Sequence, residues 1–301
     1  MSRGNPIRVS RAVAGPTGAG PSRSVVSVNG VKEAIVDVDG KHVVITGASR
    51  GLGAALADAF AAKGARLTLV ARSADQLAQV AGRTGGSALV ADLADPAQVD
   101  GLIHRVEAQH GPVDVLVNNA GIDLTGAFTQ MPMGDIQRMV QLNATTVAEL
   151  TRQVLPGMVR RGGGHVVQVS SLAGSGTFPG ISVYGATKAF VTHMTAGVRL
   201  EMAGLPVGLT VVETGLITPT DMADSVLSYP PTQASFRRFY RLLLLADADV
   251  DRVAAKTVRA VERGRRSVRM PARAFLFPML TNLPRRIVEM FLVGVPRQLD
   301  P

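Results

Sequence analysis

The chain has 301 residues, of which 46% are hydrophobic, and a formal net charge of +9. This hydrophobic content is sufficient for one substantial core, and α/β domains reach this length. The absence of cysteine excludes disulfide scaffolds, thiolate metal sites and cysteine nucleophiles, and an aromatic content of only 4% disfavours a base-stacking surface for single-stranded nucleic acid.

Nearly all of the basic residues are arginines, and they are concentrated near the two ends of the chain, in residues 3–23 and 259–286. No base-reading motif accompanies these arginines, so we expect no nucleic-acid partner. Attraction to an anionic cofactor or to an anionic membrane surface would fit the same charge. A solvated basic face is the simplest interpretation for most of these residues.

Residues 1–38 are predicted to form a flexible N-terminal extension, in which residues 26–31 could make a small hairpin around the Asn29-Gly30 turn. They lack the apolar core of a secretory signal, and no apolar run in the sequence is long enough for a transmembrane helix. We therefore expect a cytoplasmic protein, with association at a membrane surface as the alternative.

From residue 39 onward, short apolar runs alternate with helical stretches. The apolar runs predict seven strands, at residues 43–46, 67–70, 88–91, 113–117, 166–169, 209–212 and 267–270. Helices are predicted at residues 53–62, 73–80 with Ser73 as the N-cap, 95–109 with Pro96 in the first turn, 133–160, 182–202 and 250–263. Unbroken apolar strands alternating with helices are typical of a buried parallel sheet. We predict an α/β fold, a single doubly wound Rossmann-type domain over residues 39–270, whose seven-stranded, mainly parallel sheet carries helices on both faces.

Polar or turn-forming residues follow six of the predicted strands. They are Thr46, Arg72, Asp92, Asn119, Ser171 and Gly215. Ligands of doubly wound sheets bind beyond the carboxyl ends of the strands. We therefore expect these six residues to converge on one binding site.

A glycine-rich turn follows the first of these strands and opens a helix. Its glycines allow the backbone to approach a phosphate closely, and the helix N-terminus adds N–H donors and a positive dipole end. The spacing Gly-x-x-x-Gly-x-Gly differs from the strict dinucleotide fingerprint. The predicted cofactor contacts in this turn are Gly47, Ser49, Arg50, Gly51, Leu52 and Gly53.

The end of the second strand indicates which dinucleotide binds. An acid in this place holds the ribose of NAD, whereas an arginine accommodates the 2′-phosphate of NADP. The sequence has Arg72 and no acid there, and Arg50 could reach the same phosphate. We predict NADP(H) in preference to NAD(H); the alternative is that Arg72 faces only solvent.

The segment 170–188 carries the candidate chemistry. Tyr184 and Lys188 are four residues apart, which places them on the same face of a helix. A nearby cation lowers the pKa of a tyrosine, which can then exchange a proton with a carbonyl or alcohol oxygen. Ser171 could hydrogen-bond the same oxygen. Taken alone, this short motif also allows a chance surface pair.

Together these motifs resemble those of the classical short-chain dehydrogenase/reductases over residues 41–270. The matching residues, all in family order, are Thr46-Gly47-x-x-x-Gly51-x-Gly53, Asp92, Asn118-Asn119-Ala120-Gly121, Asn143, Ser171 and Tyr184-x-x-x-Lys188. The resemblance implies a catalytic set, which consists of Asn143, Ser171, Tyr184 and Lys188.

Within that set, the resemblance implies that Tyr184 is the general acid in reduction and the base in oxidation. Lys188 would hold the nicotinamide ribose and lower the tyrosine pKa, and Ser171 would orient the substrate carbonyl. Asn143 would bend its helix around a water molecule of a proton relay. No metal is required, because the nicotinamide carries the difficult chemistry.

The resemblance also implies further cofactor contacts. Asp92 and Leu93 would contact the adenine, Asn119 would support the cofactor side of the sheet, and the backbone of Ile217 would meet the nicotinamide. Family members are often homodimers or homotetramers, so we expect one of these assemblies.

One segment departs from the family pattern. Thr214 stands where the family usually has proline, and Pro219 stands where a threonine is expected, so either Thr218 or Thr220 could contact the cofactor. Residues 216–249 would form the substrate lid, and its phenylalanines and leucines suggest a hydrophobic ketone or alcohol substrate. Packing of these side chains in the core is equally consistent with the pattern.

The sequence thus predicts an NADP(H)-dependent oxidoreductase that interconverts a carbonyl and an alcohol on a small hydrophobic substrate. The alternative is a cofactor-binding regulatory or scaffold protein with the same fold. Residues 271–301 form an apolar and basic C-terminal extension that could cover the pocket, contact another subunit or lie on a membrane surface.

Overall fold

The computed structural model describes residues 25–28, 31–34, 36–243 and 245–271. The predictions for residues 1–24 and for the C-terminal extension from residue 272 onward lie outside this part of the chain. The hairpin expected around Asn29-Gly30 is present, since β1 (Val25–Val28) pairs antiparallel with β2 (Val31–Ala34).

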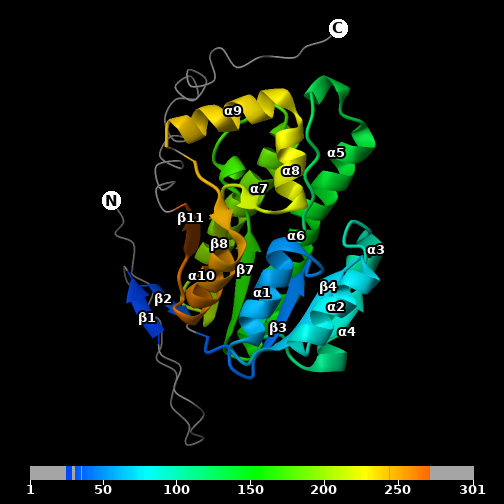
Figure 1. Ribbon diagram of the computed structural model, residues 1–301. Coiled ribbons are helices and arrows are strands. Elements are labelled where there is room, and N and C mark those ends of the chain that lie inside the picture. The colour runs from blue at the N-terminus through cyan, green and yellow to red at the C-terminus, as the bar shows by residue number, and fades with distance from the viewer. Residues whose placement is uncertain (1–24, 29–30, 35, 244, 272–301) are drawn as a thin grey trace, which may run out of the picture.

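A seven-stranded sheet forms the centre of the molecule, with the strand order β11-β8-β7-β6-β3-β4-β5 (Figure 1). The strands are β3 (His42–Thr46), β4 (Arg66–Ala71), β5 (Ser87–Val90), β6 (Val115–Asn118), β7 (Gly164–Val169), β8 (Val207–Thr214) and β11 (Ser267–Met270). All of their pairings are parallel, so the predicted doubly wound sheet is confirmed, and it is parallel throughout rather than mainly parallel.

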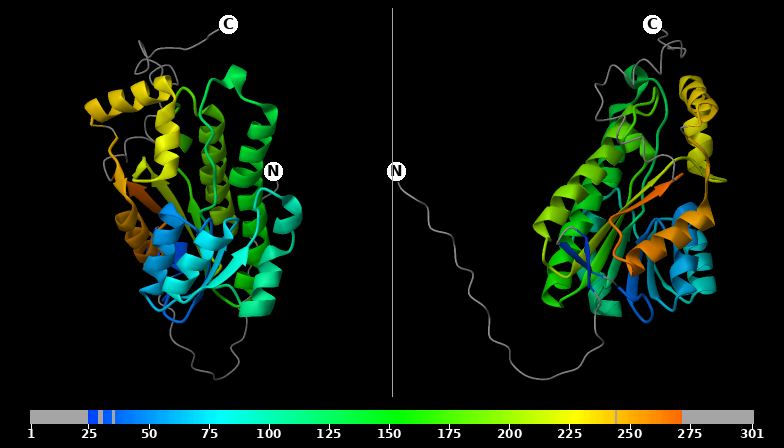
Figure 2. Two further views of the ribbon diagram at one scale, coloured as in Figure 1. Left: turned by 45° about the vertical axis from the view of Figure 1, so that its right-hand side comes forward. Right: turned by 90° about the vertical axis from the view of Figure 1, so that its left-hand side faces the viewer.

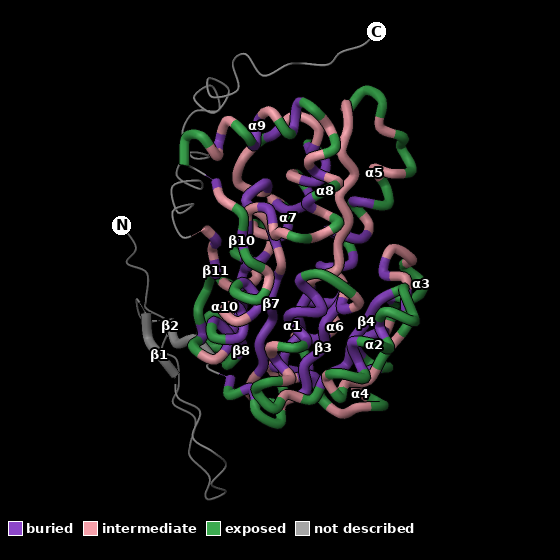
Figure 3. The backbone as a smooth tube through the Cα atoms, viewed as in Figure 1, coloured by how far each residue is buried: buried purple, intermediate pink, exposed green. Residues whose placement is uncertain are grey.

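Helices cover both faces of this sheet (Figure 2). One apolar cluster contains residues of α1 (Gly51–Ala61), α2 (Ala74–Thr84) and α10 (Val250–Glu262). The other contains residues of α4 (Leu102–His110), α6 (Thr146–Arg160) and α7 (Ser182–Glu201). Because both faces are covered, every residue of β3, β6 and β8 is buried, which explains why these strands are mostly apolar (Figure 3).

The first cluster also contains Val36 and Val38, so the packed core begins before residue 39. These two valines precede the boundary at which the sequence places the end of the flexible extension.

Two predicted helices differ in the structure. The helix expected over residues 95–109 is divided into α3 (Pro96–Val99) and α4, because Gly101 adopts a left-handed conformation between them. The helix expected over residues 133–160 consists of α5 (Met133–Val140), a π-helical turn (Gln141–Thr145) and α6. Ser73 does precede α2, but its side chain makes no capping hydrogen bond.

The segment predicted as a lid is a helical unit above the carboxyl ends of the strands (Figure 1). It contains α8 (Asp221–Ser228) and α9 (Pro230–Arg241). The strands that enter and leave it, β9 (Ile217–Thr218) and β10 (Ala248–Asp249), pair in parallel at its base. Both helices contribute to a third apolar cluster, which connects the lid to the start of α7.

Candidate active site

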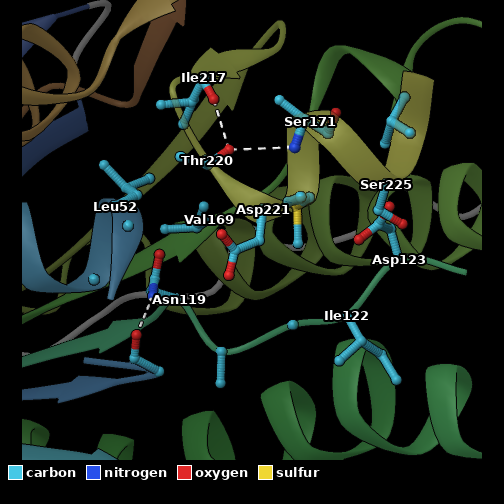
Figure 4. Close-up of a pocket in the computed structure, with 18 of the residues that line it drawn as sticks. Leu52, Asn119, Ile122, Asp123, Val169, Ser171, Ile217, Thr220, Asp221 and Ser225 are labelled. Carbon is cyan, nitrogen blue, oxygen red and sulfur yellow. Dashed lines mark hydrogen bonds between the residues drawn. The ribbon is translucent and has the colours of Figure 1, made fainter. Parts of the chain in front are cut away.

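A cavity of about 590 Å³ lies at the carboxyl ends of the strands and beneath the lid (Figure 4). This is the expected position, because ligands of doubly wound sheets bind where the strand order reverses, here between β3 and β6. The predicted site residues that line it are Gly47, Ser49, Arg50, Gly51, Leu52, Gly53, Arg72, Asp92, Leu93, Asn119, Ser171, Tyr184, Lys188 and Ile217. Two residues expected at the site do not line it, Asn143 and Thr46, and both are buried.

The glycine turn packs too closely for any larger residue at Gly53. A Cβ atom on Gly53 would lie 2.1 Å from the carbonyl oxygen of Gly47 and 2.6 Å from Nδ2 of Asn119. Asn119 in turn donates from Nδ2 to the carbonyl of Thr46 at 2.9 Å. The turn therefore presents the N-terminus of α1 directly to the cavity, a geometry suited to a phosphate group.

Two arginines border this end of the cavity. Arg72 is half-exposed at the end of β4, with Nη1 4.0 Å from Oδ2 of Asp92, and Nη2 of Arg138 lies 3.3 Å from the same oxygen. Arg50 forms an ion pair with Asp221 of α8, so the glycine turn is joined to the lid in this structure.

Ser171 and Tyr184 face the same cavity although they lie on different elements. Close packing brings them together, since a Cβ atom on Gly185 would lie only 2.8 Å from the carbonyl oxygen of Ala173. The glycine after Tyr184 therefore allows α7 to approach the turn that holds Ser171. The tyrosine is almost fully buried, and its hydroxyl lies 3.9 Å from Sδ of Met222 in the lid.

The pKa of Tyr184 differs from the sequence-based expectation. Burial raises it to about 12, the Ser171 hydroxyl acts in the opposite direction, and the Asp123 carboxylate raises it further. The expected lowering of the tyrosine pKa by Lys188 does not appear, because burial is the dominant effect. Burial also lowers the pKa of Lys188, to about 8. Nζ of Lys188 lies 5.8 Å from the tyrosine ring centroid and donates to the carbonyl of Val169 at 2.9 Å. The phenol is therefore protonated at neutral pH.

Asn143 lies in the π-helical turn, as expected for a residue that distorts its helix. Its side chain binds the backbone of Ile122 twice: Nδ2 donates to the carbonyl at 2.8 Å, and Oδ1 accepts from the N–H at 2.9 Å. Nδ2 also donates to the Thr187 hydroxyl at 3.2 Å. Asn143 thus fixes the loop that follows β6.

Among the cavity residues that the sequence analysis missed is an acid. Asp123 lines the cavity, and burial raises the pKa of its carboxyl group. The available signal was an acid two residues beyond the Asn-Asn-Ala-Gly motif, in an otherwise apolar context.

Of the two threonines left open, Thr220 lines the cavity and Thr218 does not. Thr220 also holds the start of α8, because its hydroxyl donates to the carbonyl of Ile217 at 2.6 Å and accepts from the N–H of Ala223 at 3.3 Å.

The sequence allows two roles for the apolar side chains of the lid, contact with the substrate or packing in the core, and the structure contains both. Phe236 lines the cavity and stacks on Phe178, with ring centroids 4.9 Å apart. Phe239 is buried against Phe178 outside the cavity, at 5.3 Å. Leu245 lines the cavity, whereas Leu242 and Leu243 are exposed.

Comparison with known proteins agrees with this geometry. Residues 41–229, more than half of the chain, match the family model described as short chain dehydrogenase. The chain belongs to the short-chain dehydrogenase family. Members of this family are oxidoreductases that act on small molecules.

Three relatives illustrate the similarity. The ketoacyl reductase HetN of Nostoc sp. is 39% identical over 64% of this chain and 69% of its own length. The NADP-dependent 3-hydroxy acid dehydrogenase YdfG of Salmonella typhi is 34% identical over 60% of this chain and 75% of its own. The structure of a short-chain dehydrogenase from Sphingobium yanoikuyae in complex with NADPH superimposes with a TM-score of 0.69 and 28% identity, covering 87% of this chain and 98% of that one.

None of the helices between residues 36 and 271 has the length and apolar character needed to cross a membrane. Over the same described part, we find no group of three or more His, Asp or Glu side chains arranged to hold a metal ion.

Proposed function

We propose that this short-chain dehydrogenase is an NADP(H)-dependent oxidoreductase that interconverts a ketone and an alcohol on a small hydrophobic substrate, with Tyr184 as the general acid and base. The observation that carries the proposal is that Tyr184, Ser171 and the glycine turn border one cavity. A scaffold protein would need the glycine turn but not a buried phenol beside it.

The cofactor end fits a phosphorylated dinucleotide. The turn around Gly53 leaves backbone and a helix N-terminus facing the cavity, as a pyrophosphate requires. Arg72 at the end of β4 fits the 2′-phosphate, because a guanidinium can bind it with two hydrogen bonds. Arg50 could join it, since an exposed ion pair such as Arg50–Asp221 contributes little and can be exchanged for a phosphate. The NADP-dependent and NADPH-bound relatives support the same choice.

When bound, the nicotinamide supplies the hydride chemistry. The protonated Tyr184 is in the correct state to donate a proton to a carbonyl oxygen in reduction, because burial holds its pKa well above neutral pH. Ser171 would hydrogen-bond the same oxygen and orient it. Lys188 would bind the nicotinamide ribose, and a positive charge at Nζ there would lower the pKa of Tyr184 and so ease transfer of its proton to the substrate oxygen. Asn143 would act through the loop after β6 that it fixes.

The substrate end supports an apolar body for the substrate. Phe178, Ile181, Phe236 and Leu245 line this part of the cavity. Aromatic and aliphatic surfaces of this kind bind a substrate mainly by removing its apolar area from water.

Substitution of Tyr184 tests the proposal. Tyr184→Phe should reduce turnover of a ketone by roughly a hundredfold to ten-thousandfold, because the proton donor is lost, while NADPH affinity changes little. Steady-state NADPH oxidation and NADPH titration would measure the two effects. Tyr229→Phe is the matched control, since Tyr229 does not line the cavity and its ring contact with Gly180 is kept. Unchanged turnover in Tyr184→Phe would contradict the proposal.

The domain division and the assembly are parts of the same proposal. We infer that residues 39–270 form the catalytic domain, with residues 216–249 as its lid. We also infer a homodimer or homotetramer, which light scattering on the purified chain would distinguish from a monomer.

A further inference from the structure

Asp123 is a carboxyl group in the cavity that the proposed reaction does not use. Its Oδ2 atom is enclosed by protein and has no hydrogen-bond partner among the described residues. Buried polar atoms in folded proteins are almost always hydrogen-bonded. An enclosed acceptor that borders a substrate cavity therefore points to a donor supplied by the ligand.

The position of Asp123 is fixed from two sides. On one side, the backbone of the preceding residue, Ile122, is held by two hydrogen bonds to the Asn143 side chain. On the other side, Ser225 of α8 lies next to the carboxyl group (Figure 4), and its hydroxyl acts to lower the pKa of Asp123. The buried side chains of Ala223 and Val226 fix α8 in the third apolar cluster. Asp123 and Ser225 therefore form a rigid pair, which we call the polar anchor.

The polar anchor lies within electrostatic reach of the reacting group, because the Asp123 charge raises the pKa of Tyr184. The two chain neighbours of Asp123, Ile122 and Leu124, pack against the third apolar cluster. Burial raises the pKa of Asp123, while the nearby Ser225 hydroxyl, the backbone and Thr125 act to lower it.

We propose that the polar anchor selects substrates that carry a hydroxyl or amino group a few bonds from the reacting carbonyl, and that it rejects substrates with a carboxylate at that position. This inference rests on the proposed function, which it makes more specific. The unpaired Oδ2 atom can accept a hydrogen bond from a substrate O–H or N–H, whereas a methyl group leaves it unpaired. A second carboxylate at the same place would be repelled at short range.

Three ketones with one aromatic body test this selection. They are butyrophenone, its analogue with a hydroxyl in place of the terminal methyl group, and benzoylacetate. For the unsubstituted protein, kcat/KM should favour the hydroxyl compound over butyrophenone by about tenfold to a hundredfold, as expected for a hydrogen bond to a charged group. Benzoylacetate should be the poorest of the three, and the difference should lie mainly in KM.

Two variants assign this selection to the polar anchor. In Asp123→Asn, the kcat/KM values for the hydroxyl compound and for butyrophenone should become nearly equal. The kcat/KM for benzoylacetate should rise relative to both. Ser225→Ala should reduce the preference for the hydroxyl compound over butyrophenone to a smaller extent. Asp224→Asn is the matched control, because Asp224 is exposed on the same helix and does not line the cavity, and it should keep the full preference.

The outcomes separate this inference from the proposed function. Turnover of the ketones with no preference for the hydroxyl compound, or the same preference in Asp123→Asn, would overturn the polar anchor and leave the oxidoreductase proposal intact. A second readout needs no turnover. It compares the two reduction products, the alcohol from butyrophenone and the diol from its hydroxyl analogue, by their affinity for the protein with oxidised cofactor bound, measured by thermal shift. Tighter binding of the diol that Asp123→Asn abolishes would support the anchor; equal binding of both alcohols would overturn it.

Discussion

The two ends of the cavity are built in different ways. At the cofactor end, one contiguous segment, Gly47–Gly53, supplies backbone and small residues against the N-terminus of α1. At the substrate end, side chains come from segments far apart in sequence, including Asp123 after β6, Phe178 after β7 and Phe236 in α9. The cofactor end depends on close backbone approach, whereas the substrate end depends on the docking of the lid. Changes at one end should therefore leave the other end largely intact.

The largest expected effect is at the glycine turn. Gly53→Ala should weaken NADPH binding by about a hundredfold or more, because its Cβ atom would lie 2.1 Å from the carbonyl oxygen of Gly47 and must displace the turn. Titration of NADPH against intrinsic tyrosine or cofactor fluorescence would measure the loss.

The control for this change is a glycine with free space around it. Gly82 lies in α2, and a Cβ atom there would have no neighbour within 4 Å. Gly82→Ala should keep NADPH affinity and raise the free energy of unfolding by about 0.5–1 kcal/mol, because alanine is the better helix former. Equal NADPH affinities for the two alanine variants would contradict the account of the turn.

The next largest effect is expected in the lid. Phe236→Ala should lower the free energy of unfolding by about 3 kcal/mol, since a buried ring stacked on Phe178 is replaced by a cavity. It should also raise KM for hydrophobic ketones while NADPH affinity stays close to that of the unsubstituted protein. Leu243→Ala, at a site that is 67% exposed, should change the unfolding free energy by less than about 0.5 kcal/mol. A loss of NADPH affinity as large as the loss for ketones would show that the two ends are coupled.

A smaller effect is expected on cofactor choice. Arg72→Asp should shift the selectivity between NADPH and NADH by about 2 kcal/mol, or roughly thirtyfold, towards NADH, because a charge-assisted contact to the 2′-phosphate is replaced by repulsion. Comparison of kcat/KM for the two cofactors would measure it. Arg252→Asp, an equal change of charge at an exposed site in the first turn of α10, should leave the selectivity unchanged. The assignment of Arg72 fails if both variants behave alike.

The smallest effect is a pH dependence of stability at the substrate end. The pKa of Asp123 in the folded protein is raised above the ordinary value of 3.8 by burial, so the folded state binds this proton more tightly than the unfolded state. The stability of the unsubstituted protein should therefore fall as the pH rises from 3.8 through the higher pKa of Asp123 in the folded state. Asp123→Asn should remove this loss of stability. The variant should be more stable by about 1 kcal/mol at neutral pH and gain little in acid.

Thermal unfolding across this pH range would measure the difference. Asp224→Asn, one residue before Ser225 but exposed, should show no comparable gain at neutral pH. A gain for Asp123→Asn that does not grow between acid and neutral pH would contradict the burial of the carboxylate.

The sequence by itself determined the sheet, the order of its strands along the chain and the main residues at the cofactor end of the cavity. Apolar runs such as residues 43–46 mark strands buried on both faces, and a strand end in a parallel sheet leads directly to the binding edge. Local patterns encode these features because backbone geometry is set by neighbours in the chain. The same reasoning placed Arg72 and Ser171 at one cavity.

Only the tertiary structure decided how these groups behave. The motif of Tyr184 and Lys188 predicts a lowered tyrosine pKa, but desolvation by the surrounding chain raises it to about 12. Asp123 meets Ser225 only because the lid folds back over the loop after β6. Burial and contacts between distant segments are properties of the packed chain, so spacing along the sequence does not encode them.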